Sequence, residues 1–288
     1  CDSSAWNCVI TAAKKAKIVE DKPLALVSTL SENIPEQVSF KLLESNIITL
    51  HGLDTALAAI SASSSNQKPM KPKPIFLSNP TGKSTLVDEY VAKKSLEKYG
   101  LKIPKTEKCL LSDAHFVSDQ IGYPVVLKAL GSAHKSEMGE VFLDLENQKA
   151  VKNALKKVSK KHVIIEKMID DAIVELLIGI VHDPAHGMLL TIGAGGILTE
   201  ILSDTSSLLL PSSEDDVLEC FNQLKISKIA KGYRGFSGVD VNQIVDAIMK
   251  IQEFVLDNRD KVFEIEINPL LVTSSEVIVA DALIRKVT

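Results

Sequence analysis

A short apolar run that ends at a lysine constrains the fold of this chain most strongly. The run Pro124–Leu127 reads PVVL, a β-branched composition that is typical of a buried strand, and Lys128 follows it directly. An ammonium group is costly to bury unless an anion accompanies it. The sequence therefore predicts a buried strand that brings Lys128 to an anion, and phosphate is the anion that we expect.

The loop after this strand is small, polar and basic. It reads GSAHKS from Gly131 to Ser136 and contains His134. The unperturbed pKa of histidine lies near neutrality, so a useful fraction of the imidazole is uncharged and able to attack phosphorus. We interpret His134 as a candidate nucleophile. A histidine in a solvated surface loop would have the same sequence signature.

Length and composition are those of an ordinary globular protein. The 288 residues suffice for about two domains, and 45% hydrophobic with 24% charged residues is a typical balance. A net charge of -4 gives no overall attraction to nucleic acid or anionic membranes, and no apolar stretch approaches the roughly twenty residues of a membrane span. We expect neither partner, so any phosphate site must be local.

The cysteines show neither a metal-ligand nor a disulfide pattern. Cys1, Cys8, Cys109 and Cys220 form no C-x-x-C pair and have no histidine at ligand spacing. We interpret them as reduced thiols of a cytoplasmic protein. The first residues lack a signal-peptide pattern and the chain begins without methionine, so we expect a fragment or a processed product.

The first sixty residues alternate strands and helices. Strands are expected at Pro23–Ser28 and Asn46–Leu50, and helices at Glu36–Glu44 and Asp54–Ala62. This order is typical of a doubly wound parallel sheet, but two strands are too few to bury both faces. We therefore interpret residues 1–62 as the C-terminal part of a larger α/β domain.

A stretch rich in serine, proline and lysine, residues 63–80, is predicted to be an interdomain linker. The Gly-Lys-Ser sequence that ends at Ser84 resembles part of a P-loop. The earlier glycine of that motif would fall at Leu77, so a P-loop is excluded. Ser84 is instead predicted to cap a helix over Thr85–Tyr99.

Beyond the linker, helices and strands alternate and then give way to hairpins, a pattern typical of an α+β fold. We expect two lobes, about 103–167 and 168–288. The further helices are expected at Ala114–Ile121, Asn147–Ser159, Glu214–Leu224 and Val241–Asp257, and the further strands at Val141–Leu145, His162–Ile165, Ile173–Ile180, Met188–Ile192 and Ser207–Leu210.

A glycine-rich turn follows the strand at 188–192. Its sequence GAGG contains Gly193, Gly195 and Gly196, which permit positive φ and a close approach of backbone N–H groups to phosphate. A tight hairpin would have the same signature. Glu200 follows, and Arg234, in the sequence GYRG, is a candidate to close on a phosphate.

The last forty residues contain candidate metal ligands. Glu266 and Asn268 alternate with apolar residues, so they project from one face of a strand that is predicted to end at Pro269. A hairpin with a second strand at Val277–Ala280 would bring Asp281 close to Asn268. Hard oxygen donors on adjacent strands suit Mg²⁺, which takes its other ligands from water and nucleotide phosphates. A charged outer sheet face is the alternative interpretation.

Together these segments resemble the ATP-grasp domain of the NDP-forming acyl-CoA synthetases, the family of ADP-forming acetate-CoA ligase and succinyl-CoA synthetase. The resemblance extends from about Thr81 to Thr288. It rests on YPVVLK at 123–128, HKSEMGEV at 134–141, GAGGILTE at 193–200, and EINPLLV with the later VADA. It implies an α+β ATP-grasp fold in two lobes for residues 81–288, with residues 1–62 as the end of a flavodoxin-like CoA-ligase domain.

The resemblance also implies a nucleotide site for ATP or ADP with Mg²⁺. Lys128 would bind nucleotide phosphate, and Glu166 would lie at the adenine hinge. The metal ligands would be Asn268 and Asp281, with Glu266 beside them.

By the same resemblance, His134 is a phosphate-relay histidine in the conversion of a carboxylic acid, CoA and ATP into acyl-CoA, ADP and phosphate. The CoA pocket is expected mostly in CoA-binding domains upstream in cis or on a separate subunit. One departure is Glu140, which stands where the family usually has glycine and would repel a phosphoryl group. The alternatives are a non-catalytic ATP-grasp module of an acetyltransferase-type fusion and another ATP-grasp carboxylate ligase.

Overall fold

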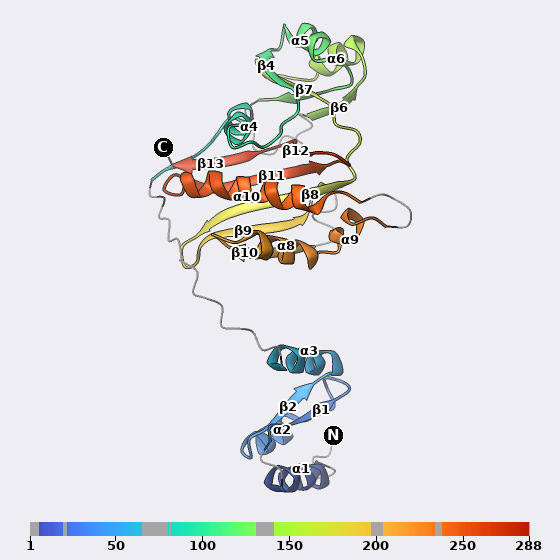
Figure 1. Ribbon diagram of the computed structural model, residues 1–288, viewed down its shortest axis with the longest axis vertical. Helices are drawn as coiled ribbons and strands as arrows, with labels where there is room; N and C mark the ends of the chain where they lie inside the picture. The colour runs from blue at the N-terminus through green and yellow to red at the C-terminus, as the bar shows by residue number, and fades with distance from the viewer. Residues whose placement is uncertain are drawn as a thin grey trace. The chain divides into compact units, whose positions relative to one another are not determined.

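The computed structural model of the chain describes residues 6–19, 22–64, 80, 82–130, 141–196, 204–233 and 238–287. The chain divides into two units, residues 1–72 and residues 73–288, and each is described by itself (Figure 1). Among the helices in the described ranges, none combines the length and the apolar character needed to cross a membrane.

The first unit contains a pair of parallel strands with helices around it. In chain order its elements are α1 (Asn7–Val19), β1 (Leu24–Ser28), α2 (Glu36–Leu43), β2 (Ile47–His51) and α3 (Leu53–Ser64). Leu24 and Leu26 pack against the cluster formed with α2, whereas Val27 and Ile48 are exposed. The predicted order of strands and helices is confirmed. Helix α1 was not predicted, because a helix with only Ile10 buried has little apolar periodicity.

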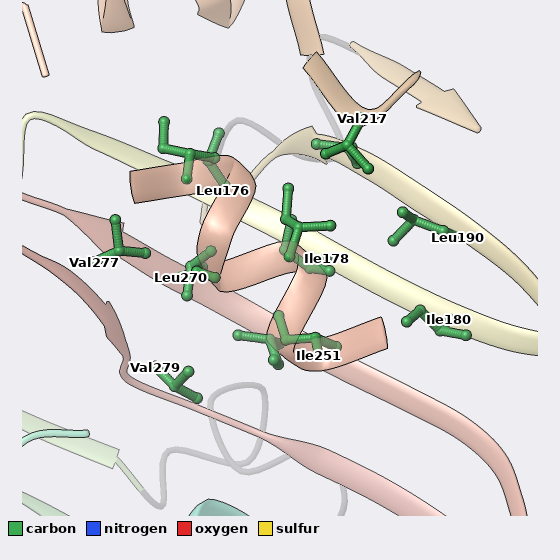
Figure 2. Close-up of a cluster of buried hydrophobic side chains, with 14 of the residues drawn as sticks. Leu176, Ile178, Ile180, Leu190, Val217, Ile251, Leu270, Val277 and Val279 are labelled. Atoms are coloured by element: carbon green, nitrogen blue, oxygen red, sulfur yellow. The ribbon is translucent and has the colours of Figure 1, made fainter. Parts of the chain in front are cut away.

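The second unit is built on two sheets, of which the larger has the strand order β10-β9-β8-β11-β13-β3, with β12 paired to β11. Its strands are β3 (Ser84–Leu86), β8 (Val174–Asp183), β9 (Gly187–Ala194), β10 (Thr205–Leu209), β11 (Val262–Val272), β12 (Val277–Val279) and β13 (Leu283–Val287). Its helices are α4 (Glu89–Glu97), α8 (Glu214–Asn222), α9 (Ile226–Ala230) and α10 (Val241–Asp257). Figure 2 shows Ile178 of β8, Leu270 of β11 and Ile251 of α10 within the core that these elements share.

The smaller sheet forms a second lobe. Its antiparallel strands follow the order β4 (Thr106–Leu110), β7 (His162–Lys167), β5 (Val125–Ala129) and β6 (Val141–Leu145). Helices α5 (Ala114–Ile121) and α6 (Gln148–Leu155) pack with it around Val125, Leu127, Val163 and Ile165 (Figure 1). The predicted α+β fold in two lobes is confirmed.

Strand periodicity turns alternate residues of β5 and β7 away from these helices. The register pairs Val126 with Glu166 and Lys128 with Ile164, so Lys128 and Glu166 are diagonal neighbours on the other face. Both side chains are buried there. The prediction of a buried strand that presents Lys128 is therefore confirmed, with Lys128 inside the strand rather than after it.

The segment before α4 corrects one prediction, because Ser84 does not cap a helix over Thr85–Tyr99. Residues Ser84–Leu86 form β3, which pairs with β13. The helix begins at Glu89, after the N-cap Asp88, whose side chain accepts a backbone hydrogen bond in the first turn. A strand whose partner lies at the other end of the chain has no local signature, so the capping signal was misassigned.

The strand β11 corrects a second prediction, because it does not end at Pro269. It continues to Val272, and its pairing with β8 shifts register between Ile267 and Leu270. A proline lacks the N–H that a regular ladder needs, and an irregularity in the pairing accommodates it. The longer strand also pairs with both β12 and β13.

Candidate functional site

Four charged side chains meet between the two sheets of the second unit. They are Glu89 and Lys93 of α4, Lys128 of β5 and Glu166 of β7, and we call them the buried charge cluster. None is more than 6% exposed. Two ammonium groups and two carboxylates balance each other, as the burial of charge requires.

Lys128 is surrounded by oxygen atoms. Its Nζ donates to Glu89 Oε1 at 2.9 Å and to the backbone oxygen of Ala280 at 2.8 Å. Glu166 Oε2 lies 3.1 Å from the same nitrogen, and Asp281 Oδ2 lies 3.8 Å from it. The anion that we expected beside Lys128 is therefore supplied, in this structure, by carboxylates of the protein itself.

Lys93 is the second ammonium group of the cluster and contacts both of its carboxylates. Its Nζ contacts Glu166 Oε1, lies 3.0 Å from Glu89 Oε1, and donates to the backbone oxygen of Ala280 at 3.1 Å. Thr106 Oγ1 of β4 lies 2.9 Å from Glu166 Oε1. Because Ala280 belongs to the connection between β12 and β13, the cluster links the smaller sheet to the larger one.

Mutual pairing keeps Lys128 and Glu166 of the cluster ionised. Burial would lower the pKa of the Lys128 ammonium, but the carboxylates of Glu166 and Glu89 outweigh burial and raise this pKa well above its usual value. Burial would raise the pKa of Glu166, but the ammonium groups of Lys128 and Lys93 outweigh it and lower this pKa. Lys128 and Glu166 therefore remain charged at neutral pH.

Sequence reasoning missed Glu89 and Lys93, although a signal was present. Glu89, Lys93 and Leu96 follow the i, i+4, i+7 spacing of one helix face, and all three are buried. Two charged residues on the apolar face of a short helix require buried partners. The sequence could not identify those partners, because they come from β5 and β7.

The predicted hairpin at the C-terminal end of the chain is confirmed. Strand β11 pairs antiparallel with β12 through Leu270 and Val279, and β13 continues the same register further along β11. When this shared register is extended over the residues between Glu266 and Leu270, Asn268 falls opposite Asp281. The expectation that these two side chains are near neighbours therefore agrees with the strand register.

The donor set at this end of the hairpin fits a magnesium ion. Glu266, Asn268 and Asp281 are partly exposed and offer amide and carboxylate oxygens, the hard donors that Mg²⁺ prefers. Asn268 Oδ1 also accepts the N–H of Gly196 at 3.0 Å, which orients the amide. Within the described ranges, no group of three or more His, Cys, Asp or Glu side chains could hold a metal. A metal here would thus need further ligands from water or a bound phosphate, and its site stays a prediction.

The glycine-rich segment packs closely against neighbouring strands, and β9 continues to Ala194, so Gly193 lies inside the strand rather than in a turn after it. A Cβ on Gly193 would come within 2.8 Å of the Thr205 side chain, and a Cβ on Gly195 within 2.6 Å of the Leu176 backbone. Gly196 has a φ of +62°. The N–H groups of Gly195 and Gly196 donate to acceptors on β8 and β11. Close packing accounts for Gly193 and Gly195 and the positive φ accounts for Gly196, and a phosphate contact by this segment stays a prediction.

The remaining predicted site residues fall into two groups. His134, Glu200 and Arg234 lie outside the described residues, as does Glu140. Glu166 is described, and both of its carboxylate oxygens lie close to lysine ammonium groups. Its role at an adenine hinge stays a prediction.

The described surface hollows lie away from the buried charge cluster. One of about 280 Å³ lies beside α2 and β2 in the first unit. Another of about 390 Å³ is lined by Leu110–Ser112 and Ser159–Lys161. Neither of these two hollows is lined by a residue of the cluster.

The features described so far are those of a known class of protein domain. They are two α+β lobes, a buried lysine on the smaller sheet, and oxygen donors on a hairpin of the larger sheet. A family model of the ATP-grasp domain matches residues 80–285, and the chain belongs to this family. The resemblance inferred from the sequence motifs is confirmed.

Relatives within the family include ADP-forming acetate-CoA ligases. Subunit beta of ADP-forming acetate-CoA ligase II from Pyrococcus furiosus is 31% identical over 207 residues, which cover 66% of this chain and 86% of that subunit. ADP-forming acetate-CoA ligase II from Archaeoglobus fulgidus is 32% identical over 207 residues and 68% of this chain. The chain spans only 30% of the length of that second relative.

A solved structure agrees with this assignment. It is the dinucleotide-forming acetyl-coenzyme A synthetase 1 of Ca. Korarchaeum cryptofilum in complex with coenzyme A and Mg-AMPPCP. It matches with a TM-score of 0.60 and 30% identity, over 68% of this chain and 90% of that one.

Replacing Glu166 by glutamine should destabilise the fold in a pH-dependent way. At pH 7 the Glu166→Gln substitution leaves two buried lysines with Glu89 as the remaining carboxylate of the cluster, and it should lower the free energy of unfolding by about 3–5 kcal/mol. The folded-state pKa of Glu166 is lowered, so its stabilisation is complete above the unfolded pKa of about 4.3 and is lost as pH falls through the folded value.

Urea unfolding of the wild type and the variant, between pH 7 and pH 3, measures this difference. Glu97→Gln is the matched control, because Glu97 pairs with Lys94 on the exposed side of the same helix and should change stability by only about 0–1 kcal/mol. A stability difference for Glu166→Gln that stays constant across the pH range would contradict the ion-pair assignment.

Proposed function

We propose that this chain is the ATP-binding, phosphoryl-transferring portion of an ADP-forming acyl-CoA synthetase, which converts a carboxylic acid, CoA and ATP into acyl-CoA, ADP and phosphate. One observation carries the proposal: Lys128 Nζ lies 3.8 Å from Asp281 Oδ2, at the end of the hairpin that bears Asn268. A cation for phosphate and hard oxygen donors for a metal therefore adjoin each other, as phosphoryl transfer requires. The acetate-CoA ligases among the relatives support the substrate class.

In this proposal the described residues bind and orient the nucleotide. Lys128 neutralises negative charge on the nucleotide phosphates. Asn268, Asp281 and Glu266 would hold Mg²⁺, which when bound adds charge neutralisation at the transferred group. Glu166 would border the adenine.

Residues outside the described ranges complete the proposed site. Glu200 and Arg234 would assist phosphate binding. A ring nitrogen of His134 would attack the γ-phosphorus of ATP, so that ADP leaves and the phosphohistidine passes its phosphoryl group onward. The Korarchaeum synthetase structure is described with a phosphohistidine segment that points towards its nucleotide-binding site, which supports a relay of this kind.

The complete reaction would need CoA-binding domains, upstream in cis or on a separate subunit. Two comparisons support this part of the proposal. The chain spans 30% of the longer Archaeoglobus relative, and the matching Pyrococcus protein is named subunit beta. A cytoplasmic location belongs to the same proposal.

Nucleotide binding should appear as thermal stabilisation. Mg-ADP or Mg-ATP at 100 times its dissociation constant should raise the free energy of unfolding by about 2.7 kcal/mol, which corresponds to an increase in Tm of about 5–10 °C. A melting curve with Mg²⁺ alone is the reference. An unchanged Tm in a sample shown by circular dichroism to be folded would rule out the nucleotide site.

The metal ligands can be tested separately from the nucleotide. Asn268→Ala and Asp281→Ala should each weaken Mg²⁺-dependent binding of ADP by about tenfold or more and leave the fold intact, because these side chains are partly exposed. Isothermal titration with and without Mg²⁺ measures the metal-dependent part. Glu264→Ala, earlier on the same strand, is the control and should bind normally. Variants that bind Mg-ADP like the wild type would show that the metal is held elsewhere.

The relay role of His134 predicts a covalent intermediate. In the presence of the CoA-binding partner domains, γ-labelled ATP should place an acid-labile, base-stable phosphate on His134. His134→Ala should lose acyl-CoA synthesis and keep nucleotide binding. His186→Ala is the control, because His186 lies exposed in the turn between β8 and β9. Full synthetic activity in His134→Ala would remove the relay role, and nucleotide binding without any phosphorylation would favour a non-catalytic module.

A further inference from the structure

Oxygen atoms of the described residues already surround the ammonium group of Lys128. An ammonium has three N–H donors. Three acceptors lie within 3.1 Å of Lys128 Nζ: the backbone oxygen of Ala280, Glu89 Oε1 and Glu166 Oε2. Two of them, Ala280 O and Glu89 Oε1, accept hydrogen bonds, and Glu166 Oε2 forms an ion pair, so a phosphate oxygen that approaches Lys128 competes with these groups.

The three acceptors differ in how firmly they are held. The Ala280 oxygen is a backbone atom, and the N–H of the same residue donates a hydrogen bond to the backbone oxygen of Pro269. Glu166 is also held by Lys93 and lies close to Thr106. These two acceptors are fixed by groups other than Lys128.

Glu89 can form an ion pair with Lys93 in place of Lys128. Its Oε1 lies 2.9 Å from Lys128 Nζ and 3.0 Å from Lys93 Nζ, so a single oxygen is shared between the two ammonium groups. Glu89 is also the first residue of α4, where the helix dipole favours a negative charge. The carboxylate of Glu89 can therefore release Lys128 and stay stabilised.

We propose that Glu89 is a positioning residue that competes with nucleotide phosphate for Lys128, and that Lys93 weakens this competition by drawing the Glu89 carboxylate toward itself. The inference rests on the proposed function, because it takes the phosphate of Mg-ADP as the competitor. Glu89 and Lys93 then set how tightly the chain binds a nucleotide, although Glu89 itself makes no contact with it.

This arrangement predicts opposite effects from two substitutions in the cluster. Glu89→Gln removes a negative charge beside Lys128 and preserves the side-chain shape, so Mg-ADP should bind about tenfold tighter or more. Lys93→Met leaves Lys128 as the one ammonium of the buried charge cluster to face its two carboxylates, so Mg-ADP should bind about tenfold weaker or more. Both substitutions break a buried ion pair and lower the stability of the fold. Loss of stability alone therefore cannot produce changes in the Kd of opposite sign.

Isothermal titration of Mg-ADP into the full 288-residue chain is the test. Glu97→Gln on α4 is the matched control, because it removes the same charge from an exposed pair and should leave the Kd unchanged. In a Lys128→Met background, Glu89→Gln should lose its effect on the Kd, because Glu89 acts through Lys128. If Glu89→Gln does not fold, Glu89→Asp shortens the side chain, retains the charge, and should tighten binding to a smaller degree.

The outcomes separate this inference from the proposed function. The competition is supported if Glu89→Gln and Lys93→Met shift the Kd of Mg-ADP in opposite directions and the effect of Glu89→Gln disappears in the Lys128→Met background. Suppose that the wild type binds Mg-ADP and that Glu89→Gln and Lys93→Met leave the Kd unchanged or shift it in the same direction. This result would overturn the inference and leave the proposed function standing. Absence of binding in the wild type and in Glu89→Gln alike would overturn the proposed function and the inference together.

Discussion

The burial of Lys128 is the constraint on which the arrangement of the second unit depends. A lysine on the inner face of a sheet is tolerated only if carboxylates surround it, and removal of one partner from a buried ion pair typically costs about 3–5 kcal/mol. The two carboxylates of the cluster come from α4 and β7. These elements, together with β5 and the connection between β12 and β13, are therefore held in one relative position by electrostatics as well as by apolar packing.

The connectivity of the chain supports the same arrangement. The first strand of the second unit, β3, pairs with its last strand, β13, and α4 follows β3 directly. Residues of α4 pack into the core of the larger sheet, while Glu89 and Lys93 on the same helix reach the smaller one. This helix therefore occupies the junction of the two lobes, and its position depends on a strand pairing between the two ends of the unit.

The sequence predicted those parts of the fold whose signals are local. Periodicity located α5 and α10 with correct ends, and the alternation around Asn268 identified the strand and hairpin that bring it opposite Asp281. The β3 strand was missed because its partner is distant in sequence. For the candidate site, the burial of Lys128 was predictable from its strand. The identity of its anion was not, because the pairing with Glu89 and Glu166 exists only in the folded chain.

The glycine-rich segment at the end of β9 has a consequence for comparing sequences within the family. At 193 and 195 any side chain would collide with Thr205 or with the backbone of β8, whatever this segment binds. Selection for a stable sheet is therefore sufficient to retain glycine at both positions. A glycine that recurs at these positions in a divergent relative is evidence of the same strand packing, and carries no information about whether that relative still binds a nucleotide.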